Sequence, residues 1–338
     1  MSIRIVLDAM GSDTRPAPEL EAAPQLIAKY PDLELLLVGN QAELEPKLKA
    51  LGAENPRIQV VNATQALEMS DHIQEARAKK DNTIQGGMDL IKAGKADAFV
   101  TAGNTGMTMY FAMKTLGMLE GVARPCLVGV LPVENGQCVV TDIGANTECR
   151  PEFLVQFAQM GSVYARQLFG LKEVKVGLIA NGEEEGKGNE LVKAAFALMK
   201  AQVPGFVGNI EGKELFSGQV HVAVTDGFTG NVLLKSTEAV AKLILHNLKV
   251  GLMQSFITKL GALLAKPAFM AVRKQLDPSE IGSAPLLGVN GLVFIGHGRS
   301  DAKAMVSAVE RAINAVKSNL LAELSSSMKP ETKEEKKA

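Results

Sequence analysis

The side chains best suited to chemistry are amides, carboxylates and glycines in loops that directly follow short apolar runs. Loops of this composition let backbone N–H groups approach a small anion at the start of a helix. The same residue types also make ordinary turns and helix caps, but their recurrence favours a binding site. We interpret it as a site for a small anion, most naturally phosphate. The residues are Asp8, Gly11, Gly103, Asn104, Thr105, Asp142, Asn146, Asp226, Gly230 and Asn231.

Three cationic side chains could assist such an anion. Lys187 lies in a Gly-rich loop after an apolar run, and Lys235 follows Asn231 by one helical turn. His297 stands between two glycines where another run ends. A Lys ammonium in a loop is a suitable point charge for phosphate. The alternative interpretation is that both lysines are solvated or packed surface residues and that His297 is a hydrogen-bonded structural histidine.

Several familiar catalytic motifs are missing from the sequence. The stretch 182–188 is one residue shorter than a Walker A loop and lacks the Ser or Thr after its Lys. No GxGxxG follows a strand, no GxSxG or HExxH occurs, and the four His are scattered without metal-ligand spacing. We therefore expect neither a metal nor a nucleotide cofactor. Cys126 and Cys138 fall in predicted strands and are interpreted as core thiols.

Composition narrows the possible partners. The net charge is −1, Trp is absent and aromatic residues make up 4% of the chain, which argues against a nucleic-acid-binding surface. The three cysteines form no CxxC and leave an odd count, as is typical of reduced thiols. Neither a signal-type apolar segment nor a run long enough to span a bilayer is found. These features predict a cytoplasmic protein that is at most peripheral to a membrane.

The elements that must position these residues alternate between strands and helices. Helical spacing of apolar residues is found over 153–168 and 305–324. This pattern predicts one α/β domain over residues 1–324, built on a mainly parallel sheet covered on both faces. We expect the loops to gather at one rim, because ligands bind beyond the carboxyl ends of parallel strands. The predicted strands are 3–7, 34–38, 58–61, 97–100, 126–131, 137–141, 174–179, 220–225 and 292–295.

Two segments stand apart from this pattern. Residues 237–276 contain no strand pattern and predict consecutive helices broken near Lys266, a helical excursion from the sheet. Residues 325–338 have almost no apolar content and predict a disordered tail.

At its loops the sequence resembles the bacterial phosphate acyltransferases, which make acyl phosphate from acyl-[acyl-carrier-protein] and inorganic phosphate for phospholipid biosynthesis. The resemblance covers about residues 3–320, and nine motifs in the same order make it specific. The sequence departs from the family pattern at Ser12, where a second glycine is usual, and at Gly282-Ser283, where Gly-Gly is usual. The motifs are Asp8-Ala-Met-Gly11, Arg77-Ala-Lys-Lys80, Ala102-Gly-Asn-Thr-Gly106, Asp142-Ile-Gly-Ala-Asn146, Met160-Gly-Ser-Val-Tyr164, Lys187-Gly-Asn-Glu190, Asp226-Gly-Phe-Thr-Gly-Asn231, Ala284-Pro-Leu-Leu-Gly288 and His297-Gly298.

The resemblance implies a fold, an assembly and roles for the residues. The fold would be a three-layer α/β/α sandwich of the phosphotransacetylase and isocitrate dehydrogenase type, with a homodimer as the assembly and no cofactor. Lys187 and Asn231 would position phosphate and polarise the carbonyl, with His297 as a secondary candidate. Residues 103–105 and 142–146 would line the pocket. The family acts at the inner face of the membrane, where the downstream glycerol-3-phosphate acyltransferase is a further expected partner.

Within the helical excursion, residues 248–266 predict one amphipathic helix with apolar residues on one face and Lys249, Lys259 and Lys266 as positive charge. Such a helix can lie on a membrane surface or pack in a dimer interface, and both interpretations stay open. Lys266, Arg273 and Lys274 could also contact an acidic carrier protein. The alternative functions are acyl transfer from coenzyme A, as in phosphotransacetylases, and a non-enzymatic membrane scaffold. An isocitrate-type dehydrogenase would need an acidic metal cluster and an Arg-rich pocket, and the sequence has neither motif.

Overall fold

The structure is a computed structural model that describes residues 2–134, 136–277, 279 and 281–329. Its strands form an 11-stranded sheet in the order β3-β2-β1-β4-β11-β10-β5-β6-β9-β7-β8. We call β3, β2, β1, β4, β11 and β10 the first half of the sheet, and the remaining strands the second half. The strands are β1 (Ile3–Asp8), β2 (Leu33–Gly39), β3 (Ile58–Asn62), β4 (Ala98–Thr101), β5 (Cys126–Val133), β6 (Gly136–Thr141), β7 (Val176–Ile179), β8 (Phe206–Ile210), β9 (Val222–Val224), β10 (Ser283–Leu287) and β11 (Leu292–Gly296).

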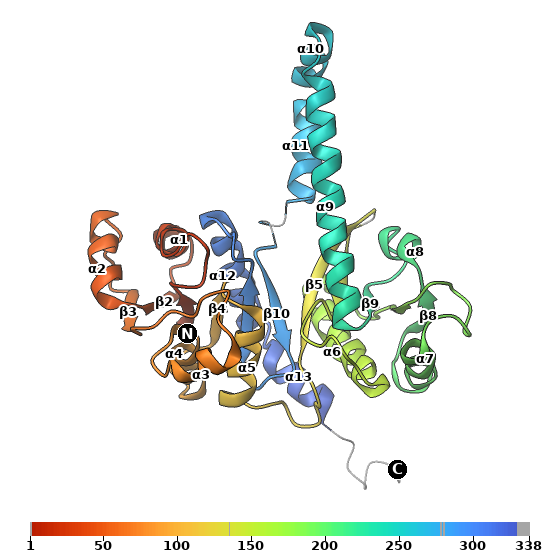
Figure 1. Cartoon of the computed structure of the whole chain (residues 1–338), viewed down its shortest axis with the longest axis horizontal. Coiled ribbons are helices and arrows are strands. Elements are labelled where there is room, and N and C mark those ends of the chain that lie inside the picture. The colour runs from red at the N-terminus through yellow and green to blue at the C-terminus, as the bar shows by residue number, and fades with distance from the viewer. Residues whose placement is uncertain (1, 135, 278, 280, 330–338) are drawn as a thin grey trace.

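Helices cover both faces of the sheet (Figure 1). One core contains buried residues of α1, α2, α6, α7, α12 and α13, and the other contains residues of α3, α4, α5, α8 and the start of α9. This confirms the expected three-layer α/β/α sandwich. The helices are α1 (Ala17–Lys29), α2 (Gln41–Ala50), α3 (Ile73–Ala78), α4 (Thr83–Lys92), α5 (Thr105–Thr115), α6 (Pro151–Phe169), α7 (Glu190–Gln202), α8 (Gly212–Phe216), α9 (Gly227–Leu252), α10 (Phe256–Leu264), α11 (Lys266–Gln275), α12 (Ala302–Lys317) and α13 (Leu320–Met328).

The nine predicted strands are all present, but β8 and β10 were missed. Each carries a residue that strands usually avoid: Gly208 lies inside β8, and Pro285 lies inside β10. The residue types in these two segments therefore did not predict that they form strands and pair with their neighbours.

Strand direction corrects the expectation of a single rim. Most neighbouring strands are parallel, as predicted, but three consecutive pairings around β10 and β5 are antiparallel. As a result β6, β9 and β7 run opposite to β1, β4 and β11. The carboxyl ends of the two sets of strands point in opposite directions, so the loops that follow them lie at opposite ends of the strands.

A gap in the sheet brings the two sets of loops back together. β10 and β5 share only two residue pairs, Leu286 with Leu127 and Leu287 with Cys126. Beyond these pairs the two strands part, and residues on both sides of the opening line one cavity. α9 begins beside this opening and extends away from the sheet (Figure 1).

The helical excursion is a tower made of the outer part of α9 with α10 and α11, which we define as residues 239–276 (Figure 1). α9 has 26 residues, which corresponds to about 39 Å of helix. The single helix predicted over 248–266 is wrong, because α9 ends at Leu252 and α10 starts at Phe256. Ser255 caps α10, and its hydroxyl accepts a hydrogen bond from the Thr258 N–H at 3.2 Å.

The C-terminal region also differs from expectation. The helix predicted over 305–324 is two helices, α12 and α13, separated at Asn319, whose φ is 54°. α13 continues to Met328, which is buried, so residues 325–328 are helical rather than part of a disordered tail. Residues 330–338 of the predicted tail lie outside the described residues.

Candidate active site

The cavity between the two halves of the sheet has a volume of about 360 Å³. It is lined by the ends of strands from both halves, by the start of α5, and by one face of the first three turns of α9. The residues of interest on its walls are Thr105, Gly144, Asn231, Lys235, Glu238, Ile281, Ser283 and His297. Sequence-predicted residues from four different loops therefore meet in one place.

On the second half, the turn after β6 is organised by the buried carboxylate of Asp142. This carboxylate accepts hydrogen bonds from the N–H groups of Leu127, Gly144 and Ala145 at 2.9–3.1 Å through one oxygen. The other oxygen accepts from the N–H of Asn146 at 2.7 Å and from its side-chain amide at 2.9 Å. Burial raises the pKa of Asp142, and the hydrogen bonds oppose that shift. Asp142 and Asn146 thus shape the turn, whereas Ile143 and Gly144 of this turn line the cavity, with Gly144 beside Asn231.

The first turn of α9 is held against that turn. Asp226 caps the helix and accepts from the N–H and hydroxyl of Thr229 at 2.9 and 2.8 Å. A Cβ atom on Gly230 would overlap the carbonyl oxygen of Asp142, so only glycine permits this approach. The next residue, Asn231, consequently lies beside Gly144, with its Cβ and Cγ 3.7 Å from where a Gly144 Cβ would stand.

On the first half, a second buried carboxylate, Asp8, organises the loops after β1 and β4. It accepts from the Thr101 hydroxyl at 2.7 Å and from the Met10 N–H at 3.0 Å. The same hydroxyl accepts from the Gly103 N–H at 2.9 Å. A Cβ on Gly11 would lie 2.8 Å from that hydroxyl, so Gly11 is required for close packing. Burial raises the pKa of Asp8.

Beneath this cluster lies a second acid, Glu19 of α1. One carboxylate oxygen of Glu19 accepts from the Ser12 N–H at 3.2 Å, whereas its other oxygen and the Ser12 hydroxyl have no partner among the described residues. Burial, with a smaller contribution from the neighbouring Asp8 charge, raises the pKa of Glu19 to about 7. The sequence analysis did not identify Glu19, since an acid in the first turn of a helix is ordinary on an exposed face.

Asn104 and Thr105, although adjacent, have different surroundings. The Asn104 side chain caps α5 through the Met107 N–H at 3.1 Å and donates to the Met69 carbonyl at 3.0 Å. Its polar atoms are therefore already engaged, and only Thr105 lines the cavity.

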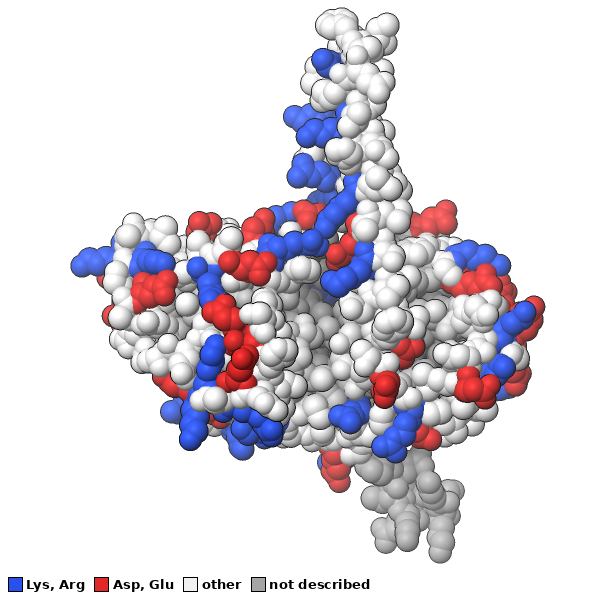
Figure 2. Space-filling model, in the orientation of Figure 1, with Lys and Arg blue, Asp and Glu red and all other residues white. Residues whose placement is uncertain are grey.

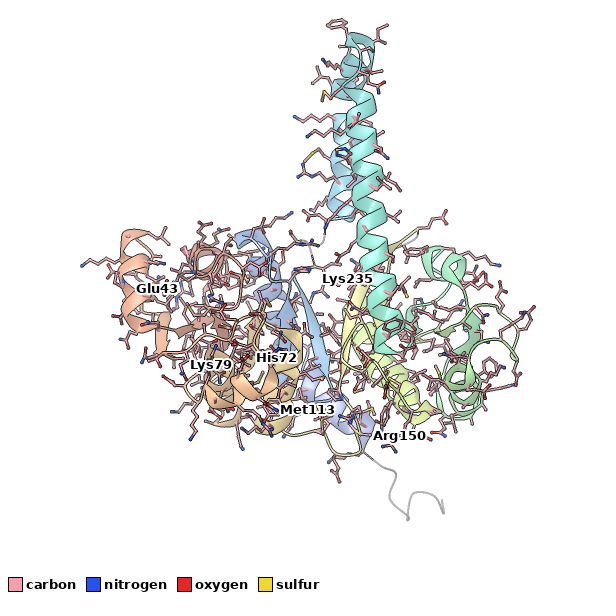
Figure 3. The ribbon with its side chains drawn as sticks, viewed as in Figure 1. Glu43, His72, Lys79, Met113, Arg150 and Lys235 are labelled. Atoms are coloured by element: carbon pink, nitrogen blue, oxygen red, sulfur yellow. The ribbon has the colours of Figure 1, made fainter. Side chains whose placement is uncertain are left out.

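His297 is exposed at the mouth of the cavity, at the end of β11. Partial desolvation, followed by the charges of Arg299 and Lys235, lowers its pKa below the usual 6.5, so the ring is neutral at pH 7. Lys235 lies on α9 at the base of the tower (Figure 3). Arg299 is paired with Glu238 at 3.0 Å, which ties the loop after β11 to α9.

Lys187 is not among the residues that line the cavity. It is exposed in the loop between β7 and α7. Its aliphatic chain packs over Gly182, and its backbone N–H donates to the Glu184 carbonyl at 3.0 Å. β7 and β9 are adjacent and parallel, so this loop and Asn231 both follow the same end of their strands. Lys187 and Asn104 follow strands of opposite direction in the two halves.

The cysteines and possible metal ligands can be placed as well. Cys126 and Cys138 are buried core thiols, as expected, and burial raises the pKa of Cys138 to about 12 and that of Cys149 to about 11. None of these thiols is therefore activated. Within the described ranges, no group of three or more His, Cys, Asp or Glu could hold a metal ion.

Sequence reasoning missed the cavity wall formed by residues 281–284 and the Arg299–Glu238 pair. The wall consists of the start of the unpredicted strand β10 and the two residues before it, so no pattern placed it opposite β5. The glycine at 282, whose φ is 73°, was the available signal for a special backbone position.

Comparison with known proteins agrees with this geometry. A family described as "Fatty acid synthesis protein" matches residues 3–323. A phosphate acyltransferase of Elusimicrobium minutum is 42% identical over 95% of this chain and 95% of its own length. The phosphate acyltransferase of Campylobacter jejuni is 43% identical over 94% of this chain and 96% of its own.

Solved structures confirm the fold. A phosphotransacetylase of Streptococcus pyogenes superposes with a TM-score of 0.62 at 16% identity, covering 94% of each chain. The EutD phosphotransacetylase of Staphylococcus aureus gives a TM-score of 0.59 at 17% identity with the same coverage. At such identity these likenesses concern the fold alone, whereas the sequence matches concern the family. The chain thus belongs to the phosphate acyltransferase family and is an acyltransferase enzyme.

Proposed function

We propose that this acyltransferase transfers a fatty acyl group from acyl-[acyl-carrier-protein] to inorganic phosphate, giving acyl phosphate for phospholipid biosynthesis. The observation that carries the proposal is the cavity between the two halves of the sheet. It combines an amide side chain, Asn231, with a lysine, Lys235, a neutral imidazole, His297, and the backbone of Gly144. This set offers hydrogen-bond donors and one positive charge to an anion.

The reaction needs little acid–base catalysis. A phosphate oxygen attacks the thioester carbon, the C–S bond breaks, and the thiolate leaves and takes a proton from solvent. Phosphate is already an anion near neutral pH, and a thiolate is a good leaving group. What the protein must supply is orientation of the two reactants and donors for the oxyanion that develops on the carbonyl oxygen.

We assign Asn231 to the thioester carbonyl, because α9 holds it in place beside Gly144 and its amide can donate to an oxyanion. Lys235 and His297 line the same cavity and suit the phosphate. Lys187 keeps its expected role as a second cation for phosphate, which requires its loop to move toward the cavity. Thr105 and Gly144 supply the remaining polar lining, while Asp8, Gly11, Gly103, Asn104, Asp142, Asn146, Asp226 and Gly230 act by shaping the two walls.

The tower suggests how the protein meets its larger partners. Residues 239–276 contain six Lys and Arg and no Asp or Glu. Figure 2 shows Lys and Arg side chains gathered along one side of the tower and at its base. This charge suits both an acidic carrier protein and anionic lipid. The apolar residues are also exposed: Phe256 and Ile257 are 82% and 80% accessible at the start of α10.

We therefore propose that the tip of the tower, around Phe256, lies on the cytoplasmic face of the membrane, close to a downstream glycerol-3-phosphate acyltransferase. The exposed apolar residues Leu243, Ile244 and Leu248 on α9 suit a homodimer contact with a second tower. None of the described helices is long and apolar enough to cross a membrane.

The acyl-transfer proposal is tested by incubating the protein with acyl-carrier-protein thioester and phosphate and trapping acyl phosphate as the hydroxamate. We expect a hydroxamate that requires phosphate, and its absence would overturn the proposal. A parallel reaction with the matching coenzyme A thioester addresses the alternative donor. If coenzyme A supports the higher kcat/KM, the donor is that of a phosphotransacetylase.

The membrane proposal is tested by flotation with vesicles that contain anionic lipid. Phe256→Glu should release the protein from the vesicles, because it places a charge at the most exposed apolar position of the tip. Thr258→Glu, which adds the same charge on the first turn of α10 without removing an apolar side chain, is the control. Equal binding by Phe256→Glu and the parent protein would exclude this anchor.

A further inference from the structure

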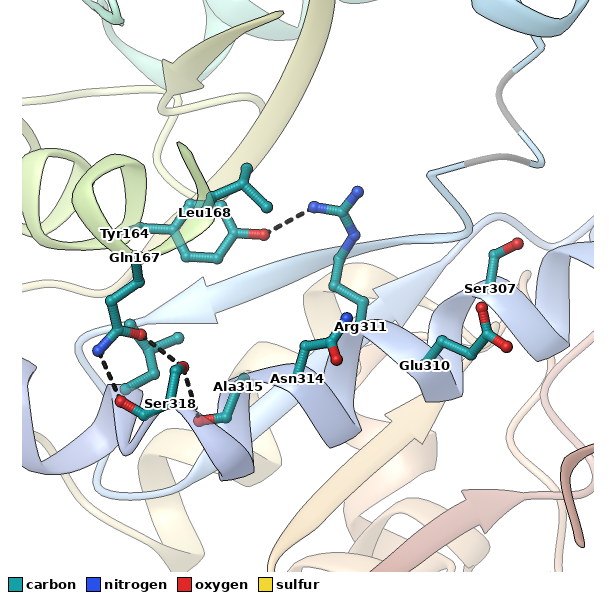
Figure 4. Close-up of a pocket in the computed structure, with 10 residues that line it drawn as sticks. Tyr164, Gln167, Leu168, Ser307, Glu310, Arg311, Asn314, Ala315 and Ser318 are labelled. Carbon is teal, nitrogen blue, oxygen red and sulfur yellow. Dashed lines mark hydrogen bonds between the residues drawn. The ribbon is translucent and has the colours of Figure 1, made fainter. Parts of the chain in front are cut away.

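A second cavity, of about 420 Å³, lies between α6, α12 and α13 (Figure 4). It shares no lining residue with the cavity between β10 and β5, and its walls belong to the core on the other side of the sheet from the start of α9. Its volume is in the range of small-molecule sites. The lining residues are Tyr164, Gln167, Leu168, Ser307, Glu310, Arg311, Asn314, Ala315, Ser318 and Leu320.

The notable group in this cavity is the half-buried guanidinium of Arg311. Its Nη1 donates to the Tyr164 hydroxyl at 2.8 Å, and its Nε donates to the Ile281 carbonyl at 3.1 Å. Within the described part of the chain, no carboxylate forms an ion pair with it. The acid on the cavity wall, Glu310, is instead paired with Lys29 at 2.6 Å. Among the described residues, the charge of Arg311 is therefore not neutralised by a carboxylate.

Tyr164 adds a second donor at the same place. Its side chain is buried, with 5% exposure, and its hydroxyl oxygen accepts from Arg311 (Figure 4). Among the described residues that hydroxyl has no acceptor for its own proton. The other polar pair on the wall is satisfied internally, since the Ser318 hydroxyl donates to the Gln167 side chain at 2.7 Å. The described lining of the cavity thus presents hydrogen-bond donors and the charge of Arg311, while its own carboxylate, Glu310, is paired with Lys29.

We propose that this cavity is a second ligand site, for a small molecule that carries one carboxylate or phosphate group and a short apolar body. Arg311 and Tyr164 would bind the anionic group, because a guanidinium and a hydroxyl bind such oxygens well. Leu168, Ala315 and Leu320 would contact the apolar part. The site is independent of the acyl-transfer proposal, since it uses none of the residues assigned to that reaction.

Arg311 also connects the two cavities. The carbonyl that accepts from its Nε belongs to Ile281, which lines the cavity between β10 and β5. A ligand that reorients the guanidinium therefore acts on the wall of the first cavity through one hydrogen bond. The second site is placed to influence the first without contacting it.

The chain offers a direct optical test because it has no Trp and only three Tyr. In a Tyr30→Phe, Tyr110→Phe variant, tyrosine fluorescence reports on Tyr164 alone. We would titrate this variant at constant ionic strength with hexanoate, hexyl phosphate, hexanol and hexylammonium. We expect a saturable change in tyrosine fluorescence with one or both anions. We expect no such change with hexanol or hexylammonium. Binding of only one anion supports the site and identifies its head group.

Two arginine variants then locate the binding. Arg311→Gln should weaken binding roughly 10- to 100-fold, as expected when a charged hydrogen-bond donor is lost. Arg311→Lys keeps the charge, so its affinity for the anion should fall less than that of Arg311→Gln. Arg166→Gln removes an exposed arginine from the same helix as Tyr164 and should have no effect. Equal binding of hexanol, or unchanged affinity in Arg311→Gln, would overturn the proposal. The Arg311 variants are checked for native circular dichroism, and the head-group series decides the question if they fail to fold.

Discussion

The two walls of the cavity between β10 and β5 are built around buried carboxylates in very different states. On the second half, Asp142 accepts five hydrogen bonds and fixes the turn against which α9 starts. On the first half, Asp8 accepts from the Thr101 hydroxyl and the Met10 N–H and is also stabilised by the Thr83 side chain, whereas the nearby Glu19 leaves one oxygen without a partner among the described residues. A fully satisfied carboxylate rigidifies its surroundings, whereas a poorly satisfied one is costly when ionised. The comparison predicts that the wall carrying Asn231 is preorganised and that the stability of the opposite wall depends on the ionisation of Glu19.

The preorganised wall should give the largest effect on catalysis. Asn231→Ala removes the amide assigned to the developing oxyanion, and we expect kcat to fall about 100- to 1000-fold, as for loss of an oxyanion donor. Asn247→Ala, an exposed position on the same helix, is the matched control for steady-state hydroxamate assays. If Asn231→Ala raised only the KM for phosphate, its role would be anion binding instead.

Lys187 tests whether a residue outside the resting cavity contributes to the reaction. If its loop moves in only when both substrates are bound, Lys187→Ala should lower kcat roughly 10- to 100-fold, the scale of a misplaced reactant. Phosphate binding to the free protein, measured by calorimetry, should change less than about twofold, because Lys187 does not line the resting cavity. Lys193→Ala, exposed on α7, is the control. Weakened phosphate binding in the free protein would mean that Lys187 already lies in the site.

These cases show how far the sequence could predict the site. Alternating strands and helices predicted the sandwich and the nine strands, and the loops after them contain the residues that meet at the cavity. The pattern of apolar residues did not predict the antiparallel pairings of β10, because Pro285 is unusual inside a strand. Without it, the loops were expected at one rim rather than on two facing walls.

Individual roles depended on contacts between distant segments. Asn104 and Asp142 looked like ligand-binding residues, yet their polar atoms are engaged by the protein itself. Asp142 accepts mainly from the turn that follows it, residues 144–146, and also from the N–H of Leu127. Asn104 donates to the carbonyl of Met69, 35 residues away in sequence.

The rigidity of the second wall can be tested through stability. Asp142→Asn replaces one acceptor oxygen by an amide that faces N–H donors, and should lower the free energy of unfolding by about 3 kcal/mol. Asp226→Asn is the matched control, since Asn is as good a helix cap as Asp, and it should cost only a few tenths of a kcal/mol. Denaturant unfolding measures both. Equal effects of the two substitutions would argue against a special role for Asp142.

The smallest expected effect is the change with pH in the free energy of unfolding that Glu19, behind the first wall, produces. The pKa of Glu19, about 7 in the folded protein, exceeds its usual 4.5, so its contribution to stability is complete below pH 4.5 and is lost as the pH rises through 7. Glu19→Gln cannot ionise and should remove this loss. Its stability relative to the parent protein should rise by about 2 kcal/mol between pH 5 and pH 8, measured by denaturant unfolding. Glu21→Gln, exposed on the same helix, should leave the pH dependence unchanged. Parallel curves for Glu19→Gln and the parent protein would show that Glu19 does not titrate in this range, and the contrast between the two walls would then rest on hydrogen-bond geometry alone.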